Sequence, residues 1–209
     1  KIKIDSIPPN FLEHLMGYFQ LADELANTIA GGYNDVMNEH KVPYWYRPDK
    51  TGTLDYGVLA HDGSELAILD LKYGVGVYVT ANENDQAIIY AVSTIKDLES
   101  TGFVFETDAK ISIYIYQPRH RDFTGEAECW TATYEELMDY AIDIEADYKA
   151  SKVADPNDRT PSPDACKFCD ANVVCQEKSR QMFDKIPPEV NMLVPASHAS
   201  GLQLPEIGE

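Results

Sequence analysis

The chain has 209 residues, 44% of them hydrophobic, so it is long enough for one packed domain with a small appendage and too short for two full domains. It carries 35 acidic and 17 basic side chains, a net charge of −18, which excludes a protein that coats nucleic acid through bulk charge. No apolar run approaches the roughly 18 residues that a membrane span requires, and the start of the chain lacks a secretory signal, so we expect a soluble cytoplasmic protein with no membrane partner.

The first part of the chain has apolar residues at helical spacing. Apolar residues recur at helical spacing after Asn10, a candidate N-cap, and the pattern ends at the glycine pair 31–32, which predicts an N-terminal helix. Residues 42–46 then have β-like composition. A polar loop with proline and glycine is expected to lead into a strand at 54–60.

A hairpin is predicted next. The Asp-Gly turn at 62–63 precedes a nearly continuous apolar run at 65–72, which is typical of a central strand covered on both faces. Alternating valines at 75–79 predict a third strand. Residues 83–100 have one apolar helical stripe and should form a helix that ends at Gly102.

In the second half of the chain, predicted strands are again followed by a helix. Segments 103–105 and 111–116 are rich in aromatic and β-branched residues and predict two strands. Thr133 and Glu136 form a capping box that opens a helix to about residue 154. The element order predicts a mixed α/β fold.

Three regions are expected along the chain. Residues 1–155 should form the core with its helical N-terminal part, residues 156–184 a cysteine segment, and residues 185–209 a tail without clear periodicity.

A carboxylate and an ammonium share one strand face. Asp70 and Lys72 are two apart on the predicted central strand, and Asp55 lies on the neighbouring hairpin strand. Two carboxylates can bind Mg²⁺ and leave positions for water and a substrate phosphate, the chemistry of phosphodiester cleavage. Lys72 would then hold the attacking water or neutralise charge on the phosphorane. The plainer interpretation is an ordinary ion pair at a strand end.

Gln86 and Tyr90 lie four apart on the next helix, opposite its apolar stripe, and are free to line a cleft. Taken singly, each also fits a solvated glutamine and a half-buried tyrosine.

Several short motifs follow one another in the chain. They are Gly52-Thr-Leu-Asp55, Asp70-Leu-Lys72 with Tyr73-Gly-Val-Gly76, Asn84-Asp-Gln86-Ala-Ile-Ile-Tyr90, Gln117-Pro-Arg119, and Cys166, Cys169 and Cys175 near the end. This succession, over residues 45–180, resembles the PD-(D/E)XK nuclease superfamily in its RecB/AddB-like branch. It is closer still to a phage and prophage family of exonuclease-like proteins formerly of unknown function.

The resemblance implies a restriction-endonuclease-like core, with a mixed central sheet flanked by helices and a C-terminal cysteine-cluster tail. It implies that Asp55, Asp70 and the backbone carbonyl of Leu71 hold Mg²⁺ or Mn²⁺, and that Lys72 is the catalytic lysine. The activity implied is an Mg²⁺-dependent deoxyribonuclease, an exonuclease that serves phage replication or recombination beside a phage recombinase or replication protein. A phage-encoded chain would act in the host-cell cytoplasm.

The resemblance also implies that Gln86 and Tyr90 contact DNA near the site. This branch usually carries a further histidine or glutamate ligand on an early helix. His14, Glu24 and Glu39 are candidates, but none has the surrounding motif, so that ligand stays unassigned.

The cysteines suggest a second metal. Cys166, Cys169 and Cys175 have the spacing that thiolate-bound zinc or an iron–sulfur cluster needs, but a fourth ligand is missing. The resemblance implies a 4Fe-4S cluster that staples the tail to a cysteine ahead of the core, where this chain has none. The fourth ligand is then Cys129 or a residue of a preceding segment, or else the site is incomplete; zinc is the less favoured metal.

Because the protein is so acidic, any DNA must bind at a local patch of basic side chains. The loop with Arg119 and Arg121 offers two guanidiniums for phosphate contacts, unless these pair with neighbouring carboxylates. Arg47 and Lys50, on the approach to Asp55, offer another path. Two alternatives to a nuclease remain: a nucleic-acid-binding or assembly protein that has lost cleavage, and a thiolate-zinc interaction module.

Overall fold

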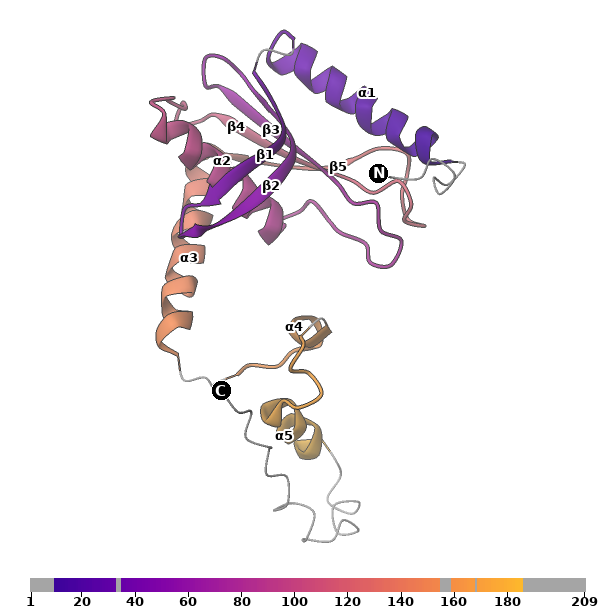
Figure 1. The fold of residues 1–209 in the computed structure, drawn as a ribbon, viewed down its shortest axis with the longest axis vertical. Coiled ribbons are helices and arrows are strands. Elements are labelled where there is room, and N and C mark those ends of the chain that lie inside the picture. The colour runs from indigo at the N-terminus through magenta and orange to yellow at the C-terminus, as the bar shows by residue number, and fades with distance from the viewer. Residues whose placement is uncertain (1–9, 33–34, 155–158, 168, 186–209) are drawn as a thin grey trace, which may run out of the picture. The chain divides into compact units, whose positions relative to one another are not determined.

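The computed structural model describes residues 10–32, 35–154, 159–167 and 169–185. The chain divides into two compact units, Lys1–Ser151 and Lys152–Glu209, which are described separately (Figure 1). Most of the predicted tail lies outside the described residues.

The first unit is built on a five-stranded mixed sheet in the order β1-β2-β3-β4-β5. The strands are β1 (Val36–Tyr44), β2 (Arg47–Leu59), β3 (Glu65–Leu71), β4 (Lys110–Tyr116) and β5 (Glu128–Thr133). Only the β3–β4 pair is parallel; the other neighbours are antiparallel. A parallel pair needs a crossover, and the helix α2 (Asp85–Ser100) lies within it. The predicted mixed α/β fold is confirmed.

Helices cover both faces of the sheet. On one face α1 (Phe11–Ile29) buries Tyr18, Ala22 and Leu25 against β2, β3 and β4. On the other, α2 and the first half of α3 (Tyr134–Val153) share one apolar cluster with the sheet, and Figure 1 shows α1 and α2 on opposite sides of the strands. β3 is therefore buried from both sides, as its continuous apolar run predicts.

Local capping fixes where two helices begin. The side chain of Asn84 accepts a hydrogen bond from the Ala87 N–H at 3.1 Å and caps α2. The predicted capping box of α3 is present: Glu136 Oε2 accepts the Thr133 N–H at 2.8 Å, and Thr133 Oγ1 accepts the Glu136 N–H at 3.2 Å.

Several predicted strand boundaries are wrong. The expected polar loop before residue 54 is the first half of β2, which pairs with β1 in a long hairpin. β1 begins at Val36, well before the predicted segment. Residues 103–105 do not form a strand, although Phe105 is buried in the core. The sequence pattern did not predict β5.

The valines at 75–79 do not form a strand either. The buried side chain of Gln117 takes the place of a strand neighbour, because its Oε1 accepts the Val79 N–H at 3.0 Å and its Nε2 donates to the Val77 carbonyl at 2.6 Å. The segment is thus a loop held by a side chain, with Val75 57% exposed.

The second unit contains α4 (Pro163–Lys167) and α5 (Gln176–Asp184). Among the described residues of the whole chain, no helix is both long and apolar enough to cross a membrane.

Candidate metal and nucleic-acid site

Two carboxylates lie where β2 and β3 stop pairing. Their ladder ends at the Tyr56–Leu69 pair, and Asp55 and Asp70 are the adjoining residues on the two strands. Asp55 Oδ2 accepts a hydrogen bond from the Leu71 N–H at 2.9 Å, which ties Asp55 to the end of β3. The two predicted metal ligands therefore lie at one fork in the sheet.

An irregularity in β1 accompanies this fork. Glu39 has a φ of 48°, a left-handed conformation that costs a residue other than glycine about 1 kcal/mol or more. The flanking pairs, residue 38 with 56 and residue 40 with 54, place Glu39 across from Asp55. Leu54 packs in the α2-side cluster, whereas Tyr56 packs in the α1-side cluster, so β2 changes faces at Asp55 and its outer half turns toward α2.

Asp70 is the buried member of the pair, 6% exposed. The Lys72 ammonium donates to its Oδ1 at 3.2 Å and lies 3.0 Å from its Oδ2, but Oδ2 has no hydrogen-bond donor among the described residues. Burial raises the pKa of Asp70, and the charge of Asp55 adds to this, while the hydrogen bond and charge of Lys72 oppose it. A cation at Oδ2 would favour the ionised form.

A polar chain leads from Lys72 to α2. Lys72 Nζ donates to Gln86 Oε1 at 3.0 Å, and Gln86 Nε2 donates to the Tyr90 hydroxyl at 3.3 Å. Burial, and then the charge and hydrogen bonding of Tyr90, raise the pKa of Tyr44 at the end of β1. The structure therefore brings together the predicted residues Asp70, Lys72, Gln86 and Tyr90.

The candidates for the additional ligand lie in different places. His14 Nδ1 is 3.4 Å from the Tyr73 hydroxyl, one residue beyond Lys72, and Glu24 is exposed on α1. Glu39 lies on β1, across from Asp55 on β2. Among the described residues, no group of three or more His, Cys, Asp or Glu side chains could hold a metal ion, so the fork offers two carboxylates and backbone oxygen.

Sequence reasoning missed Tyr18. Burial and then the charges of Asp55, Asp70 and Glu39 raise the pKa of its hydroxyl, which therefore lies near the fork on the α1 side. Nothing in the sequence distinguishes this tyrosine from a core residue, because it lies in the buried stripe of α1.

The two arginines of the 117–123 loop differ. The Arg119 guanidinium lies over the Tyr73 ring, 4.9 Å from its centroid, and so beside the residue that follows Lys72. The Arg121 side chain is 88% exposed, with its Nε 3.7 Å from Asp122 Oδ2. Arg119 therefore lies beside the residue that follows Lys72, whereas Asp122 is the carboxylate beside Arg121 among the described residues. Of the other predicted cations, Arg47 faces Asp49 at 3.5 Å and Lys50 is exposed on β2.

The three clustered cysteines all lie in the second unit. Cys166 is in α4, Cys169 follows it in a turn, and Cys175 is the N-cap of α5. The pKa of the Cys175 thiol is lowered, mainly by a hydrogen bond from the Lys178 backbone N–H.

Cys129 is on β5 of the first unit, paired with Tyr114, and burial raises the pKa of its thiol. Within the described part of the second unit, Cys166, Cys169 and Cys175 do not form a three-ligand metal group.

Comparison with known families places the chain with a family of unknown function. A family model described as a protein of unknown function, DUF2800, matches residues 6–200, nearly the whole chain.

Proposed function

We propose that this chain, which belongs to the DUF2800 family, is a metal-dependent DNA nuclease with a PD-(D/E)XK core. One observation carries the proposal: Asp55 and Asp70 adjoin the last β2–β3 pair, and Lys72 contacts Asp70 from the same strand end. An ordinary ion pair would not require a second carboxylate at the fork or a glutamine on the far side of the ammonium.

The residues at the fork fit a magnesium ion. Mg²⁺ is usually bound through one or two carboxylates together with water and substrate phosphate, so Asp55, Asp70 and the carbonyl of Leu71 suffice as protein ligands. The Lys72 ammonium lies 3.0 Å from the buried Asp70 Oδ2 without forming a hydrogen bond to it, so this oxygen still has room for a metal ion as a second partner. Bound Mg²⁺ would polarise a phosphate oxygen and lower the pKa of water.

The side chains around the fork have separate roles in this mechanism. Lys72, held between Asp70 and Gln86, presents its ammonium to the attacking water or to the charge that develops on the phosphate. Gln86 and Tyr90 fix the position of that ammonium. Arg119, whose guanidinium lies 4.9 Å from the centroid of the Tyr73 ring, would contact the next phosphate along the strand.

The exonuclease mode and a role in phage replication or recombination are supported by the motif resemblance alone. The same holds for a 4Fe-4S cluster on Cys166, Cys169 and Cys175, with Cys129 or a residue of a preceding segment as fourth ligand. In favour of metal binding there, hydrogen bonding lowers the pKa of Cys175, and a thiolate is the form that binds metal.

Metal-dependent cleavage tests the proposal. Linear DNA labelled at one end should be degraded with Mg²⁺ and spared with EDTA, and a crystal grown with Mn²⁺ should show anomalous density between Asp55 and Asp70. Intact DNA under every metal condition would contradict a nuclease.

A binding or assembly protein without cleavage is the second candidate. It is favoured by the net charge of −18 and by the fact that, in the part of the chain the structure describes, no third acidic, histidine or cysteine side chain joins the fork. Such a protein would bind DNA in the same assay without degrading it. A thiolate-zinc module would leave the contacts among Asp70, Lys72 and Gln86 without a role.

A further inference from the structure

Four aromatic side chains cluster at the closed end of the β1–β2 hairpin, beside α3 (Figure 1). Tyr44 ends β1, and Trp45 and Tyr46 form the turn that leads into β2. The rings of Tyr44 and Tyr46 are stacked, with centroids 5.8 Å apart. The Tyr46 ring also has edge-to-face contacts with Trp45 at 4.8 Å and with Tyr148 of α3 at 5.1 Å. All four residues are half-buried, so the cluster is partly open to solvent.

The composition of this turn is unusual. Two-residue hairpin turns are normally built from glycine, asparagine or aspartate, which adopt the turn conformation at low cost. Tryptophan and tyrosine have no such local advantage, so their contribution is contact surface. Part of that surface is used in packing, because Trp45 borders the α2-side cluster and Tyr46 contacts Tyr148. The rest remains accessible.

The aromatic cluster continues the polar chain that starts at Lys72. A Cβ on Gly52 would meet both Tyr90 Cε1 and the Tyr44 hydroxyl, so these two side chains adjoin over the backbone of residue 52. Tyr90 is hydrogen-bonded to Gln86, and Gln86 to Lys72. Because Tyr90 packs against the α2-side cluster, the path from the ammonium to the hairpin end stays on the α2 side of the sheet.

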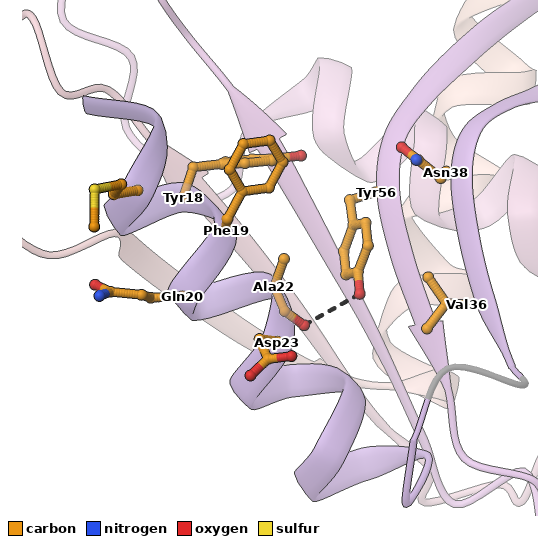
Figure 2. Close-up of a pocket in the computed structure, with 9 residues that line it drawn as sticks. Tyr18, Phe19, Gln20, Ala22, Asp23, Val36, Asn38 and Tyr56 are labelled. Atoms are coloured by element: carbon orange, nitrogen blue, oxygen red, sulfur yellow. Dashed lines mark hydrogen bonds between the residues drawn. The ribbon is translucent and has the colours of Figure 1, made fainter. Parts of the chain in front are cut away.

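The opposite face of the sheet has a groove that does not connect to this path. The groove, of about 600 Å³, lies between α1 and the outer strands, where the Tyr56 hydroxyl donates to the Ala22 carbonyl at 3.1 Å (Figure 2). Among the described residues, neither carboxylate of the fork lines it, nor does Lys72. A strand held at Lys72 would therefore leave along the α2 side.

The hairpin end is basic within an acidic protein. Residues 41–50 carry Lys41, Arg47 and Lys50 against the single carboxylate of Asp49, a net charge of +2, whereas the whole chain has −18. Arg47 Nε lies 3.5 Å from Asp49 Oδ1, but both side chains are exposed, so this pair holds the guanidinium weakly. Cations beside aromatic rings are the combination that binds an unpaired nucleic-acid strand, because its bases stack while its phosphates meet the charges.

We propose that the closed end of the β1–β2 hairpin binds the unpaired strand of DNA that leads into the fork, and that DNA with a single-stranded end is the substrate class of this site. The inference rests on the proposed nuclease function. A base stacks on the cluster around Tyr46, and Arg47 and Lys50 contact the phosphates of the strand. Because the four rings support one another before DNA arrives, little side-chain freedom is lost on binding. A base inside a duplex is covered on both faces by its neighbours and could not use these rings.

Trp45 provides a reporter inside the cluster. The chain has two tryptophans, and Trp130 is on β5, at the other edge of the sheet from β1. Trp130→Phe leaves Trp45 as the single tryptophan, and Trp45→Phe leaves Trp130 as the matched control. Each protein is titrated with a 12-mer of thymidine and with a blunt 20-base-pair duplex. Ca²⁺ replaces Mg²⁺, which separates binding from cleavage.

The 12-mer should quench the emission of Trp45 in the Trp130→Phe protein and leave the emission of Trp130 in the Trp45→Phe protein unchanged. The duplex should bind about 5- to 150-fold more weakly, the range for loss of one stacked base. With a fluorescein-labelled 12-mer followed by anisotropy, Tyr46→Ala should weaken binding over the same range. Tyr46→Phe should bind as the wild type does.

A second set of variants leaves every ring in place, since Tyr46→Ala also removes packing at the hairpin end. The double change Arg47→Ala with Lys50→Ala should lower the slope of log affinity against log salt by about 1.4, the value for two phosphate contacts of a single strand. Lys110→Ala is the matched control, because Lys110 faces Glu65 at the opposite end of the β3–β4 pair from the fork. It should leave the slope unchanged.

Unchanged Trp45 emission, with 12-mer binding by anisotropy and Mg²⁺-dependent cleavage both intact, overturns the hairpin proposal and leaves the nuclease proposal standing. An unaltered salt slope in the double variant also overturns it. Equal affinity for the 12-mer and the duplex overturns the single-stranded substrate class. A wild-type protein that neither binds nor cleaves DNA contradicts the proposed function itself.

Discussion

The backbone of Gly52 lies directly against the ring of Tyr90: a Cβ on residue 52 would stand 2.4 Å from Tyr90 Cε1 and 2.8 Å from the Tyr44 hydroxyl oxygen. This contact joins the outer half of the β1–β2 hairpin to α2. Because Tyr90 is hydrogen-bonded to Gln86, and Gln86 to Lys72, the absence of a side chain at residue 52 helps to set the position of the Lys72 ammonium. The first residue of the Gly52-Thr-Leu-Asp55 motif thus acts through packing.

Gly52→Ala should therefore damage both stability and activity. The added methyl group must displace the Tyr90 or Tyr44 ring, and overpacking of this kind costs about 1–3 kcal/mol in the free energy of unfolding. Urea denaturation and DNA cleavage measure the two effects. Gly76→Ala is the matched control, because nothing lies within 4 Å of a Cβ there, and it should change stability by less than about 0.5 kcal/mol. An unchanged Gly52→Ala protein would show that the hairpin does not position Tyr90.

Asp70→Ala should abolish Mg²⁺-dependent cleavage and leave the fold intact. The change removes a proposed metal ligand, worth several kcal/mol in the transition state, or about 10³-fold in rate. Loss of a buried carboxylate relieves an unfavourable charge, whereas loss of the ion-pair partner of Lys72 opposes this, so the melting temperature should change little. Asp139→Asn, an exposed change on α3, should keep full activity. Undiminished turnover in pure Asp70→Ala would remove the proposed site.

Long periodic segments were predictable from the sequence, since each repeats one signal over many residues. The helix at 83–100 and the buried strand at 65–72 were expected within two residues of α2 and β3. Where the prediction failed, a contact distant in sequence decides the structure. The valines at 75–79 have strand periodicity, but their backbone groups bond to Gln117, about 40 residues away.

In the candidate site too, contacts between residues close in sequence were predictable, whereas contacts that depend on distant packing were not. Asp70 and Lys72 share a strand face by simple alternation, so their contact was predictable from spacing. That Asp55 would reach the Leu71 N–H follows from where β2 and β3 stop pairing, which no local pattern records. Tyr18 illustrates the limit, because its proximity to both carboxylates depends on how α1 packs on the sheet.

The proposed iron–sulfur cluster in the cysteine segment can be tested first by the colour of the purified protein. If Cys166, Cys169 and Cys175 bind a 4Fe-4S cluster, anaerobically purified protein should be brown, with iron and sulfide in nearly equal amounts. Cys166→Ser should bleach it and make the second unit more sensitive to protease. Cys129→Ser then decides whether this chain supplies its own fourth ligand. Colourless protein with stoichiometric zinc would show that the iron assignment is wrong.

Tyr134 should give the fold an alkaline limit. Its hydroxyl donates to Glu99 Oε1 at 2.6 Å, joining the first residue of α3 to the end of α2, and burial with this hydrogen bond raises its pKa to about 12. Because the folded pKa exceeds the ordinary value of about 10, the contribution is complete below pH 10 and is lost as the pH rises toward 12. Tyr134→Phe should cost about 1 kcal/mol at pH 8 and flatten the decline between pH 10 and 12. Equal declines in both proteins would contradict this.

The contrast between Arg119 and Arg121 supplies a test of the DNA path with its own control. Both belong to one loop and carry the same charge, but only Arg119 contacts Tyr73 beside Lys72, whereas Arg121 faces Asp122.

With Ca²⁺ present, Arg119→Ala should weaken DNA binding and lower the slope of log affinity against log salt by about 1, the effect of one lost phosphate contact. Arg121→Ala should leave the slope unchanged, since a solvated side chain next to its own carboxylate displaces few counterions. Equal effects would mean that DNA responds to the charge of the whole loop. If neither change alters the slope, the DNA path lies elsewhere, toward Arg47 and Lys50 on the approach to Asp55.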